Sequence, residues 1–313
     1  MKKSISIELK VTDRCNQRCF HCMNSDGPDS GADLDWRLFI RKLDEWASDR
    51  NESVYDIKAV RMTGGEPLLC LNAVLEIARS CSRLGIKSGI NTSGTLMDSS
   101  IARLLKEAGV TTVKISLDAS EEAAYRRIRG PSCSLDRMLE GIRVTAGFGF
   151  KVVLRFTLSR YNRDKLVSCY HMAGDLGVNE FQVKPLISAG RAVGSKAFLS
   201  KEEINEALLE VADSVSGQTP LVEILCWPPE KASRLKYRIC GSINKIYIST
   251  NLQVTICNYV LGTEPIGDMC RDSLESILGR RHCDEWVSPE GYHVISACPQ
   301  ICFFSHEPSS MNS

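Results

Sequence analysis

The sequence lacks a long apolar segment, an excess of charge and a secretory leader. No stretch of its 313 residues stays apolar over the length that a bilayer requires, and no signal-peptide core follows the N-terminus. The formal net charge is only +1, so no electrostatic attraction to nucleic acid or to an anionic membrane is expected. These absences predict a cytoplasmic protein whose partners include neither nucleic acid nor membrane.

Cysteine, in contrast, is abundant, with 14 residues. Because no secretory leader accompanies them, these thiols argue against a disulfide framework and for metal ligation in a reducing compartment. The hydrophobic share of 43% and the charged share of 25% are those of an ordinary globular protein. The sequence therefore predicts a folded metal protein whose ligands are cysteines.

Three of these cysteines, Cys15, Cys19 and Cys22, form one short C-x₃-C-x₂-C segment. It follows the apolar alternation of Ile5 to Leu9, which predicts a strand, so we expect a loop at the end of that strand. A structural zinc site usually takes four protein ligands, and this loop supplies three. A [4Fe–4S] cluster is usually held by four thiolates, so three would leave one iron open to another ligand.

A second segment, Met62-Thr63-Gly64-Gly65-Glu66-Pro67, follows another apolar run. Together with the cysteine loop, it resembles the radical S-adenosylmethionine (radical SAM) enzymes. In that family the open iron binds SAM, and an electron from the cluster cleaves SAM to a 5′-deoxyadenosyl radical that abstracts a substrate hydrogen. Taken alone, the two glycines also fit an ordinary turn between a strand and a helix. The resemblance implies that SAM lies beside His21, Gly64, Gly65, Glu66 and Pro67.

Short apolar strands alternate with amphipathic helices as far as about residue 187. Six such units predict a parallel sheet with helices outside it, closed only in part. The resemblance implies the same α/β fold, a partial (β/α)₆ TIM-like barrel. The predicted strands are Ile5–Leu9, Ile57–Met62, Ile86–Asn91, Thr112–Leu117, Lys151–Leu158 and Glu180–Pro185, and the predicted helices are Asp35–Ala47, Leu71–Leu84, Ser99–Ala108, Leu135–Phe148 and Arg163–Leu176.

The texture of the sequence changes after Pro220 to short strands, turns and scattered cysteines. We therefore predict a barrel domain at residues 1–219, which ends with a helix at about 201–216 that a capping box begins. A small α+β domain is predicted at 220–306, and a frayed tail at 307–313.

Four cysteines of the second domain, Cys240, Cys257, Cys298 and Cys302, are candidate ligands of another site. A β-hairpin is predicted at 246–256, between the first two of them. This arrangement resembles the auxiliary-cluster domains called SPASM and twitch, which implies a second [4Fe–4S] cluster. A Cys₄ zinc site is the alternative, because four thiolates suit zinc and iron–sulfur centres alike.

The second domain departs from the SPASM pattern at several positions. The last cysteine pair is spaced C-x₃-C, and Leu252 stands where a glycine is usual. The segment 266–278 matches the helix that those domains carry. Cys226 is not assigned to this site: it is either a buried apolar thiol or a ligand or hydrogen-atom donor in catalysis.

Polar residues at the ends of the third and fourth strands are candidate SAM contacts. Asn91 and Ser93 belong to a turn that resembles the family's ribose-binding segment, although such a turn can also simply cap a strand. Ser116 and Asp118 alternate to one side of the fourth strand, and the resemblance implies contact with the SAM carboxylate and ribose.

Arg155 lies inside an otherwise apolar strand, where a buried guanidinium needs a partner. It suits the SAM carboxylate, or else an ion pair with Asp118 or Glu66. The stretch from Tyr125 to Gly130 resembles another family motif, although its arginines also fit a solvated helix face.

The resemblance implies an enzyme that oxidises or otherwise modifies a small molecule or a short peptide in natural-product or cofactor biosynthesis. The chain begins directly at its first strand, which favours a small substrate or a peptide delivered by another protein. A flavodoxin or ferredoxin is the expected reducing partner. A radical SAM peptide epimerase or crosslinking enzyme is the enzymatic alternative, and a zinc-stabilised binding protein is the non-enzymatic one.

Overall fold

One curved sheet of eleven strands carries the fold, in the order β11-β10-β9-β1-β2-β3-β4-β5-β6-β7-β8. The computed structural model describes residues 2–23, 31–48, 53–215, 220–225, 235–238, 244–256, 265–280, 285–287 and 293–295. None of the helices in these ranges combines the length and the apolar composition needed to cross a membrane.

The six predicted strands are confirmed, and each pairs in parallel with the next along the chain. A parallel sheet is covered on both faces, and all six residues of the last of these strands are buried accordingly. The strands are β1 (Lys3–Thr12), β2 (Tyr55–Gly64), β3 (Lys87–Thr92), β4 (Val110–Ser116), β5 (Lys151–Leu158) and β6 (Glu180–Pro185).

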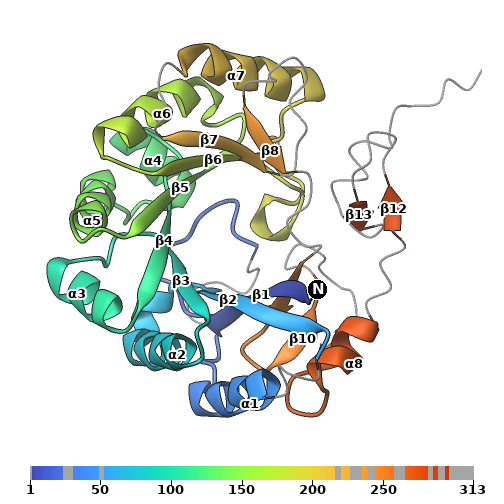
Figure 1. Ribbon diagram of the computed structural model, residues 1–313. Helices are drawn as coiled ribbons and strands as arrows, with labels where there is room; N and C mark the ends of the chain where they lie inside the picture. Colours follow the sequence, from blue (N-terminus) through green and yellow to red (C-terminus); the bar gives the residue numbers. More distant parts are fainter. Residues whose placement is uncertain are drawn as a thin grey trace, which may run out of the picture.

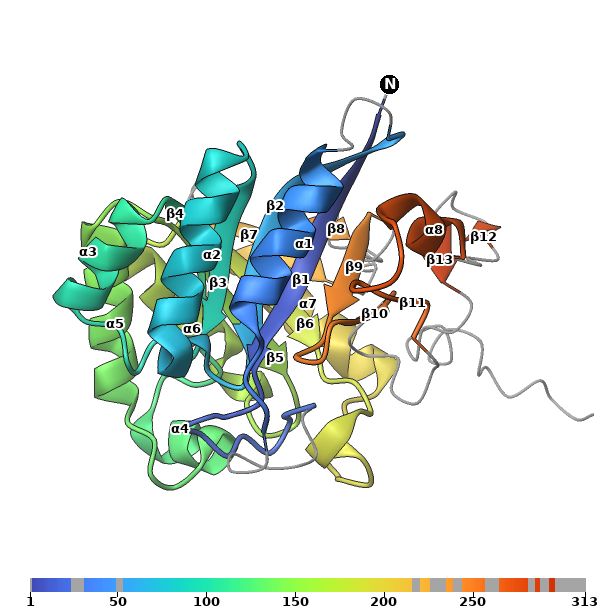
Figure 2. The same ribbon diagram turned by 90° about the horizontal axis from the view of Figure 1, so that it is seen from below.

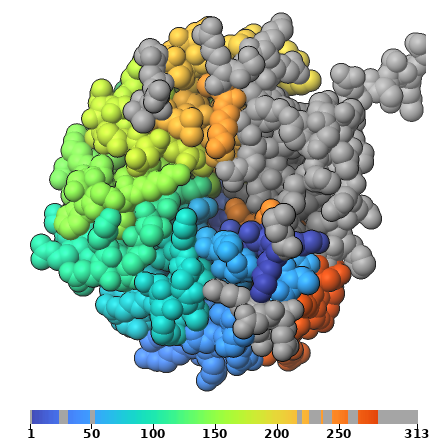
Figure 3. Space-filling view, viewed as in Figure 1, coloured from blue at the N-terminus to red at the C-terminus, as the bar shows by residue number. Residues whose placement is uncertain are grey.

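Helices cover the convex side of the sheet (Figure 1). In the space-filling view the colours run in sequence order around this outer side, from the blue of the N-terminal part to the yellow of α7 (Figure 3). Their apolar faces form the core; in α2, for example, Val74, Ile77, Ala78 and Cys81 are buried at helical spacing. The helices are α1 (Trp36–Ser48), α2 (Leu71–Arg83), α3 (Ser99–Glu107), α4 (Glu122–Arg129), α5 (Leu135–Gly147), α6 (Leu166–Asp175), α7 (Lys201–Ser214) and α8 (Leu274–Gly279), with short 3₁₀ turns η2 (Pro67–Cys70), η3 (Arg163–Lys165) and η4 (Gly190–Ala192).

The sheet continues beyond the six predicted strands at both edges. Strands β7 (Leu221–Leu225) and β8 (Lys236–Arg238) extend it in parallel from β6. On the other edge β9 (Lys245–Ile248) pairs in parallel with β1, followed by β10 (Gln253–Thr255) and β11 (Gly267–Asp268) in antiparallel order. The predicted boundary at residue 219 therefore falls between neighbouring strands of one sheet. A separate pair, β12 (Glu285–Val287) and β13 (His293–Ile295), is antiparallel.

Strands β9 and β10 confirm the predicted hairpin. Its turn places Leu252 at a φ of 62°, in the left-handed region that glycine adopts without strain. The resemblance to the auxiliary-cluster domains predicts glycine at this position, and the backbone conformation of Leu252 is one that favours glycine. The Leu252 side chain is buried, and its burial offsets the backbone cost.

Candidate functional site

The cysteine loop lies at the carboxyl end of the parallel strands, where β1 leaves the sheet. Figure 2 shows β1 descending from the N-terminus to this loop, beside α4. Cys19 is 8% exposed, whereas Cys15 and Cys22 are partly exposed. The Gln17 N–H donates to Cys15 Sγ at 3.4 Å, so a hydrogen-bond donor already faces a sulfur atom.

The donor set fits a cluster better than a single ion. In the part of the chain that the structure describes, no three Cys, His, Asp or Glu side chains are grouped to hold one metal ion. A [4Fe–4S] cluster needs no such group, because each thiolate binds a different iron. Burial raises the pKa of the Cys15 thiol to about 12 and also raises the pKa of Cys19, so both thiolates need a positive centre to form at neutral pH.

Two glycines bind the cysteine loop to β2. The Gly65 N–H donates to the Thr12 carbonyl and the Glu66 N–H to the Arg14 carbonyl, each at 2.8 Å. A Cβ on Gly65 would stand 2.0 Å from the Arg14 carbonyl oxygen, and one on Gly64 would stand 2.3 Å from the Thr12 oxygen. These glycines therefore admit the chain's own loop, and their predicted contact with SAM stays a prediction.

We expect Gly65→Ala to displace the cysteine loop and lower the iron bound per chain after reconstitution. The methyl group meets main-chain atoms that cannot rotate away, so we expect a cost above the usual ~1–3 kcal/mol of overpacking. Gly147→Ala is the matched control, because a Cβ there meets nothing within 4 Å. Equal iron content in the two variants would contradict this role of Gly65.

Two further segments, the end of α4 and the chain after β6, form hydrogen bonds with the backbone of the cysteine loop. At the end of α4 the Arg129 carbonyl accepts the Arg18 N–H at 3.1 Å. After β6, the Arg191 N–H donates to the Cys22 carbonyl and its Nε to the Cys19 carbonyl, both at 2.9 Å. The backbone of the loop is thus fixed by elements that are far apart in sequence.

Glu66 links the loop of β2 to the end of β3. Its carboxylate is 1% exposed and accepts hydrogen bonds from Thr92 Oγ1 at 2.6 Å, Ser93 N–H at 2.8 Å and Ser93 Oγ at 2.7 Å. The structure therefore brings two of the predicted contact positions, Glu66 and Ser93, together through protein hydrogen bonds. Pro67 begins the short turn η2, which Glu66 also caps through Leu68 N–H.

Asp118 is fully buried after β4 and forms an ion pair with Arg129. Its other oxygen accepts the Thr157 N–H at 2.7 Å, and His21 Nε2 lies 3.5 Å away. The interpretation of the α4 arginines as a solvated face is wrong for Arg129, which is 6% exposed. Burial lowers the pKa of His21 to about 4, with Arg129 reinforcing burial and Asp118 opposing it, so this imidazole is neutral at pH 7.

Arg155 forms neither of the predicted ion pairs, because Asp118 is taken by Arg129 and Glu66 by the turn after β3. It lies in register between Ser116 on β4 and Gln182 on β6. Its Nε is buried and makes no hydrogen bond within the described part of the chain. The predicted contacts of Ser116 and Arg155 with SAM stay predictions.

Known proteins share this arrangement. The sequence pattern of the radical SAM superfamily matches residues 9–173, which include the cysteine loop, the Gly-Gly-Glu-Pro segment and Asp118. This chain belongs to the radical SAM superfamily. It is therefore a radical SAM enzyme that uses a [4Fe–4S] cluster and SAM, and the alternative of a non-enzymatic zinc protein is dropped.

Two relatives of this radical SAM enzyme are named for one activity. A probable GTP 3′,8-cyclase of Saccharolobus islandicus is 30% identical over 299 residues, covering 88% of this chain and 91% of the relative. The GTP 3′,8-cyclase of Bradyrhizobium diazoefficiens is also 30% identical, covering 84% of this chain and 78% of the relative.

Solved structures share the fold at low identity. SuiB of Streptococcus suis, bound to its precursor peptide SuiA, matches with a TM-score of 0.70 and 13% identity, over 88% of this chain and 64% of SuiB. The chain thus spans just under two thirds of SuiB. Native anSMEcpe with bound AdoMet matches with a TM-score of 0.66 and 16% identity, over 87% of this chain and 80% of that protein. These likenesses confirm the partial radical SAM barrel.

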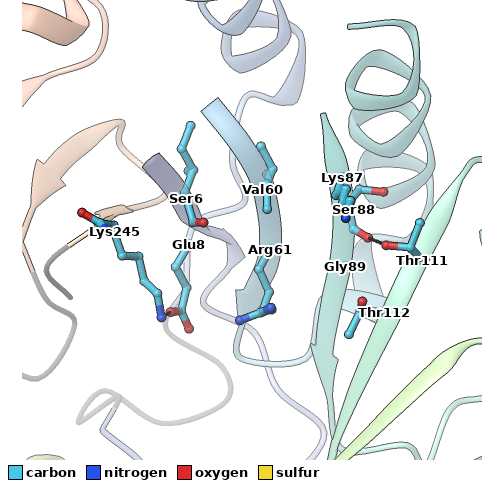
Figure 4. Close-up of a pocket in the computed structure, with 13 residues that line it drawn as sticks. Ser6, Glu8, Val60, Arg61, Lys87, Ser88, Gly89, Thr111, Thr112 and Lys245 are labelled. Carbon is cyan, nitrogen blue, oxygen red and sulfur yellow. Dashed lines mark hydrogen bonds and ion pairs between the residues drawn. The ribbon is translucent and has the colours of Figure 1, made fainter. Parts of the chain in front are cut away.

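The inside of the radical SAM barrel carries charges that were missed in the sequence. Glu8 on β1 pairs with Lys245 on β9 at 3.2 Å, and Arg61 extends to the same level (Figure 4). Asn91 Nδ2 donates to the other Glu8 oxygen at 3.3 Å, so its side chain faces the barrel. Burial would raise the pKa of the Glu8 carboxyl. The charges of Lys245, Arg155 and Arg61 outweigh burial and lower that pKa to about 2.

Lys114 on β4 lies in the same interior and donates from Nζ to Gln182 Oε1 at 2.9 Å. Burial lowers the pKa of Lys114 to about 5, reinforced by the charges of Arg155, Arg61 and Lys245 and opposed by Glu8. The interior therefore has a positive field. Gln182 is held in turn by Glu180 and Glu223, and Lys184 is also buried on β6.

A cavity of about 450 Å³ lies at the amino ends of the strands, within the range of small-molecule pockets. Its lining includes Ser6, Glu8, Arg61, Gly89, Thr112 and Lys245. The cavity and the cysteine loop thus lie toward opposite ends of the barrel strands.

The predicted second metal site lies outside the described residues. This applies to all four of its candidate ligands and to the uncommitted thiol, namely Cys240, Cys257, Cys298, Cys302 and Cys226. Of that site the structure confirms only the hairpin of β9 and β10 that precedes Cys257.

Proposed function

We propose that this radical SAM enzyme modifies a small anionic molecule that binds inside the barrel, in cofactor or natural-product biosynthesis. One observation carries the proposal: the part of the interior around Glu8 has an excess of positive charge. There the cations Arg61, Arg155 and Lys245 outnumber the carboxylate of Glu8 and disfavour a further positive charge on Lys114, whereas Glu180 and Glu223 lie around Gln182. An anion entering this space lowers the electrostatic energy of the three cations.

The names of the relatives give this substrate class a first candidate. Both are called GTP 3′,8-cyclases, and GTP is a small polyanion. GTP is therefore the first substrate to test.

Each part of the barrel has a role in this proposal. Cys15, Cys19 and Cys22 hold the cluster, which together with SAM supplies the 5′-deoxyadenosyl radical when both are bound. Arg155 is proposed to face the carboxylate of SAM. Its positive charge adds to the field of the interior whether or not SAM is bound. A second [4Fe–4S] cluster at Cys240, Cys257, Cys298 and Cys302 and reduction by a flavodoxin or ferredoxin remain parts of the proposal.

The test compares GTP with guanosine, which has the same base and sugar but no phosphate. We expect the anaerobically reconstituted protein, with SAM and dithionite, to form 5′-deoxyadenosine faster with GTP than with guanosine and to consume GTP. Arg61→Met should raise the KM for GTP by about tenfold or more, as expected for the loss of ~1.5–3 kcal/mol of charge-assisted contact. The readout is mass spectrometry of 5′-deoxyadenosine and of the nucleotide product.

Lys58→Met is the matched control, because Lys58 is a mostly exposed cation on the same strand. It should leave the KM unchanged. Two results would contradict an anionic substrate. One is equal stimulation of 5′-deoxyadenosine formation by GTP and guanosine, and the other is no stimulation by GTP, guanosine or any other nucleoside phosphate. A precursor peptide would then be the next substrate to test.

A further inference from the structure

Arg129, the last residue of α4, is a buried cation, unlike the other arginines of this helix. Arg126 and Arg127 are exposed on the same helix turn, whereas Arg129 is 6% exposed. The helix ends at Gly130, whose φ of 116° turns the chain back toward the cysteine loop. Arg129 lies on the buried side of α4 together with Tyr125 and Ile128, so its guanidinium is directed inward, to the first metal-binding loop.

Arg129 contacts one candidate cluster ligand directly. Its Nη1 donates to Cys19 Sγ at 3.6 Å, within the range of a hydrogen bond to sulfur. Its Nη2 pairs with Asp118, which is fully buried. Its carbonyl oxygen accepts from Arg18, so main chain and side chain act on the same loop. A cation and an anion are therefore fixed next to the sulfur of Cys19.

The two charges act on a cluster in opposite directions. Reduction of a [4Fe–4S] centre adds one electron from an external low-potential reductant and takes the cluster from 2+ to 1+, with no proton required. The added negative charge spreads onto the thiolate sulfurs, so a hydrogen bond and a positive charge at Cys19 favour the reduced form. The carboxylate of Asp118 disfavours it by the same Coulombic argument.

We propose that Arg129 and Asp118 set the reduction potential of the cluster held by Cys15, Cys19 and Cys22. Arg129 raises the potential and makes it easier for the reductant to load the electron. Asp118 holds the guanidinium at the sulfur and limits the size of that increase. Arg129 is a positioning residue in this role, because it acts through the cluster ligand Cys19.

The experiment measures the midpoint potential by an EPR-monitored dithionite titration of the reconstituted full chain, without SAM or substrate. SAM binds the open iron of this cluster, so a separate sample with SAM identifies its signal. We expect Arg129→Met to shift the equilibrium between oxidised and reduced cluster by about tenfold toward the oxidised form. This corresponds to a midpoint potential about 59 mV lower for a one-electron couple. Asp118→Asn should shift it in the opposite direction, and Arg129→Lys should restore part of the wild-type potential.

Arg126→Met is the matched control, since it removes one exposed cation from the same helix turn. It should leave the potential unchanged. Shifts of the same sign in Arg129→Met and Asp118→Asn, or no shift in either, would overturn the proposal and reduce the pair to a structural clamp. If Arg129→Met binds no iron, the nearly isosteric Asp118→Asn decides alone, and an unchanged or lower potential in that variant overturns it.

Discussion

Replacing Cys15, Cys19 and Cys22 together by alanine is expected to reduce 5′-deoxyadenosine formation to the background measured without protein. The three thiols are the cysteine ligands that the loop offers to iron, and no other described Cys, His, Asp or Glu side chains are grouped to replace them. Without the cluster, no electron reaches SAM. The measurement is 5′-deoxyadenosine by mass spectrometry after anaerobic reconstitution and reduction by dithionite.

The same variant separates the two predicted metal sites. We expect it to keep the iron of the second site, so that roughly half of the iron of a protein with two [4Fe–4S] clusters remains. Cys270→Ala is the control for the loss of a thiol, because Cys270 is exposed and away from the loop. Residual SAM cleavage by the triple variant would refute the assignment of the first cluster.

Lys114→Met is expected to make the protein more stable at pH 7. The amine of Lys114 has a pKa of about 5 in the folded barrel, compared with 10.5 as the reference value for a free chain, so folding at pH 7 requires its deprotonation. That step costs about 5 kcal/mol at 1.36 kcal/mol per pKa unit. The variant also loses the hydrogen bond to Gln182 Oε1, and this unpaired oxygen lowers the stability of the variant by about 1–3 kcal/mol. The expected net gain is about 2–4 kcal/mol, measured by urea unfolding.

The pH dependence gives the sign of this effect. Between pH 5 and 10.5 the unfolded wild type holds one proton more at residue 114 than the folded form, so its stability rises with pH relative to the variant. The advantage of Lys114→Met should therefore shrink by about 1.4 kcal/mol per pH unit and vanish between about pH 8.5 and pH 10, above which the lost hydrogen bond makes the variant the less stable protein. Lys58→Met, an exposed control, should show no such trend. A constant difference between pH 6 and 9 would mean that Lys114 is charged in the folded protein.

The barrel was predictable because its strands and helices have clear periodicity and clear ends. The predicted span Lys151–Leu158 is that of β5, and the capping box at Ser200 and Glu203 begins α7 as expected. The strands β7 and β8 were harder to place, because strands of five and three residues have too little pattern to show which sheet they join.

The residues of the site were more predictable from the sequence than the contacts between them. The sequence indicated Glu66, Ser93 and Asp118 but not that Glu66 binds Ser93, because partners in a three-dimensional site leave no mark at a fixed spacing. The sequence left open whether the arginines of α4 form a solvated face, because three arginines on one short helix resemble one; in the structure Arg129 shares the buried side of α4 with Tyr125 and Ile128. The charges of Glu8 and Lys114 did leave a signal, because both interrupt strands that should be apolar on both faces.

The pairing of β1 with β9 has a consequence for how the chain folds as it is synthesised. Lys245 contacts Glu8 across 237 positions of sequence, so one edge of the first strand has no partner until most of the protein has left the ribosome. Until then that edge is an open template for pairing with another nascent chain. Closure of a loop of this length is slow, which makes early release or truncation before residue 245 a route to aggregation rather than to a smaller working enzyme.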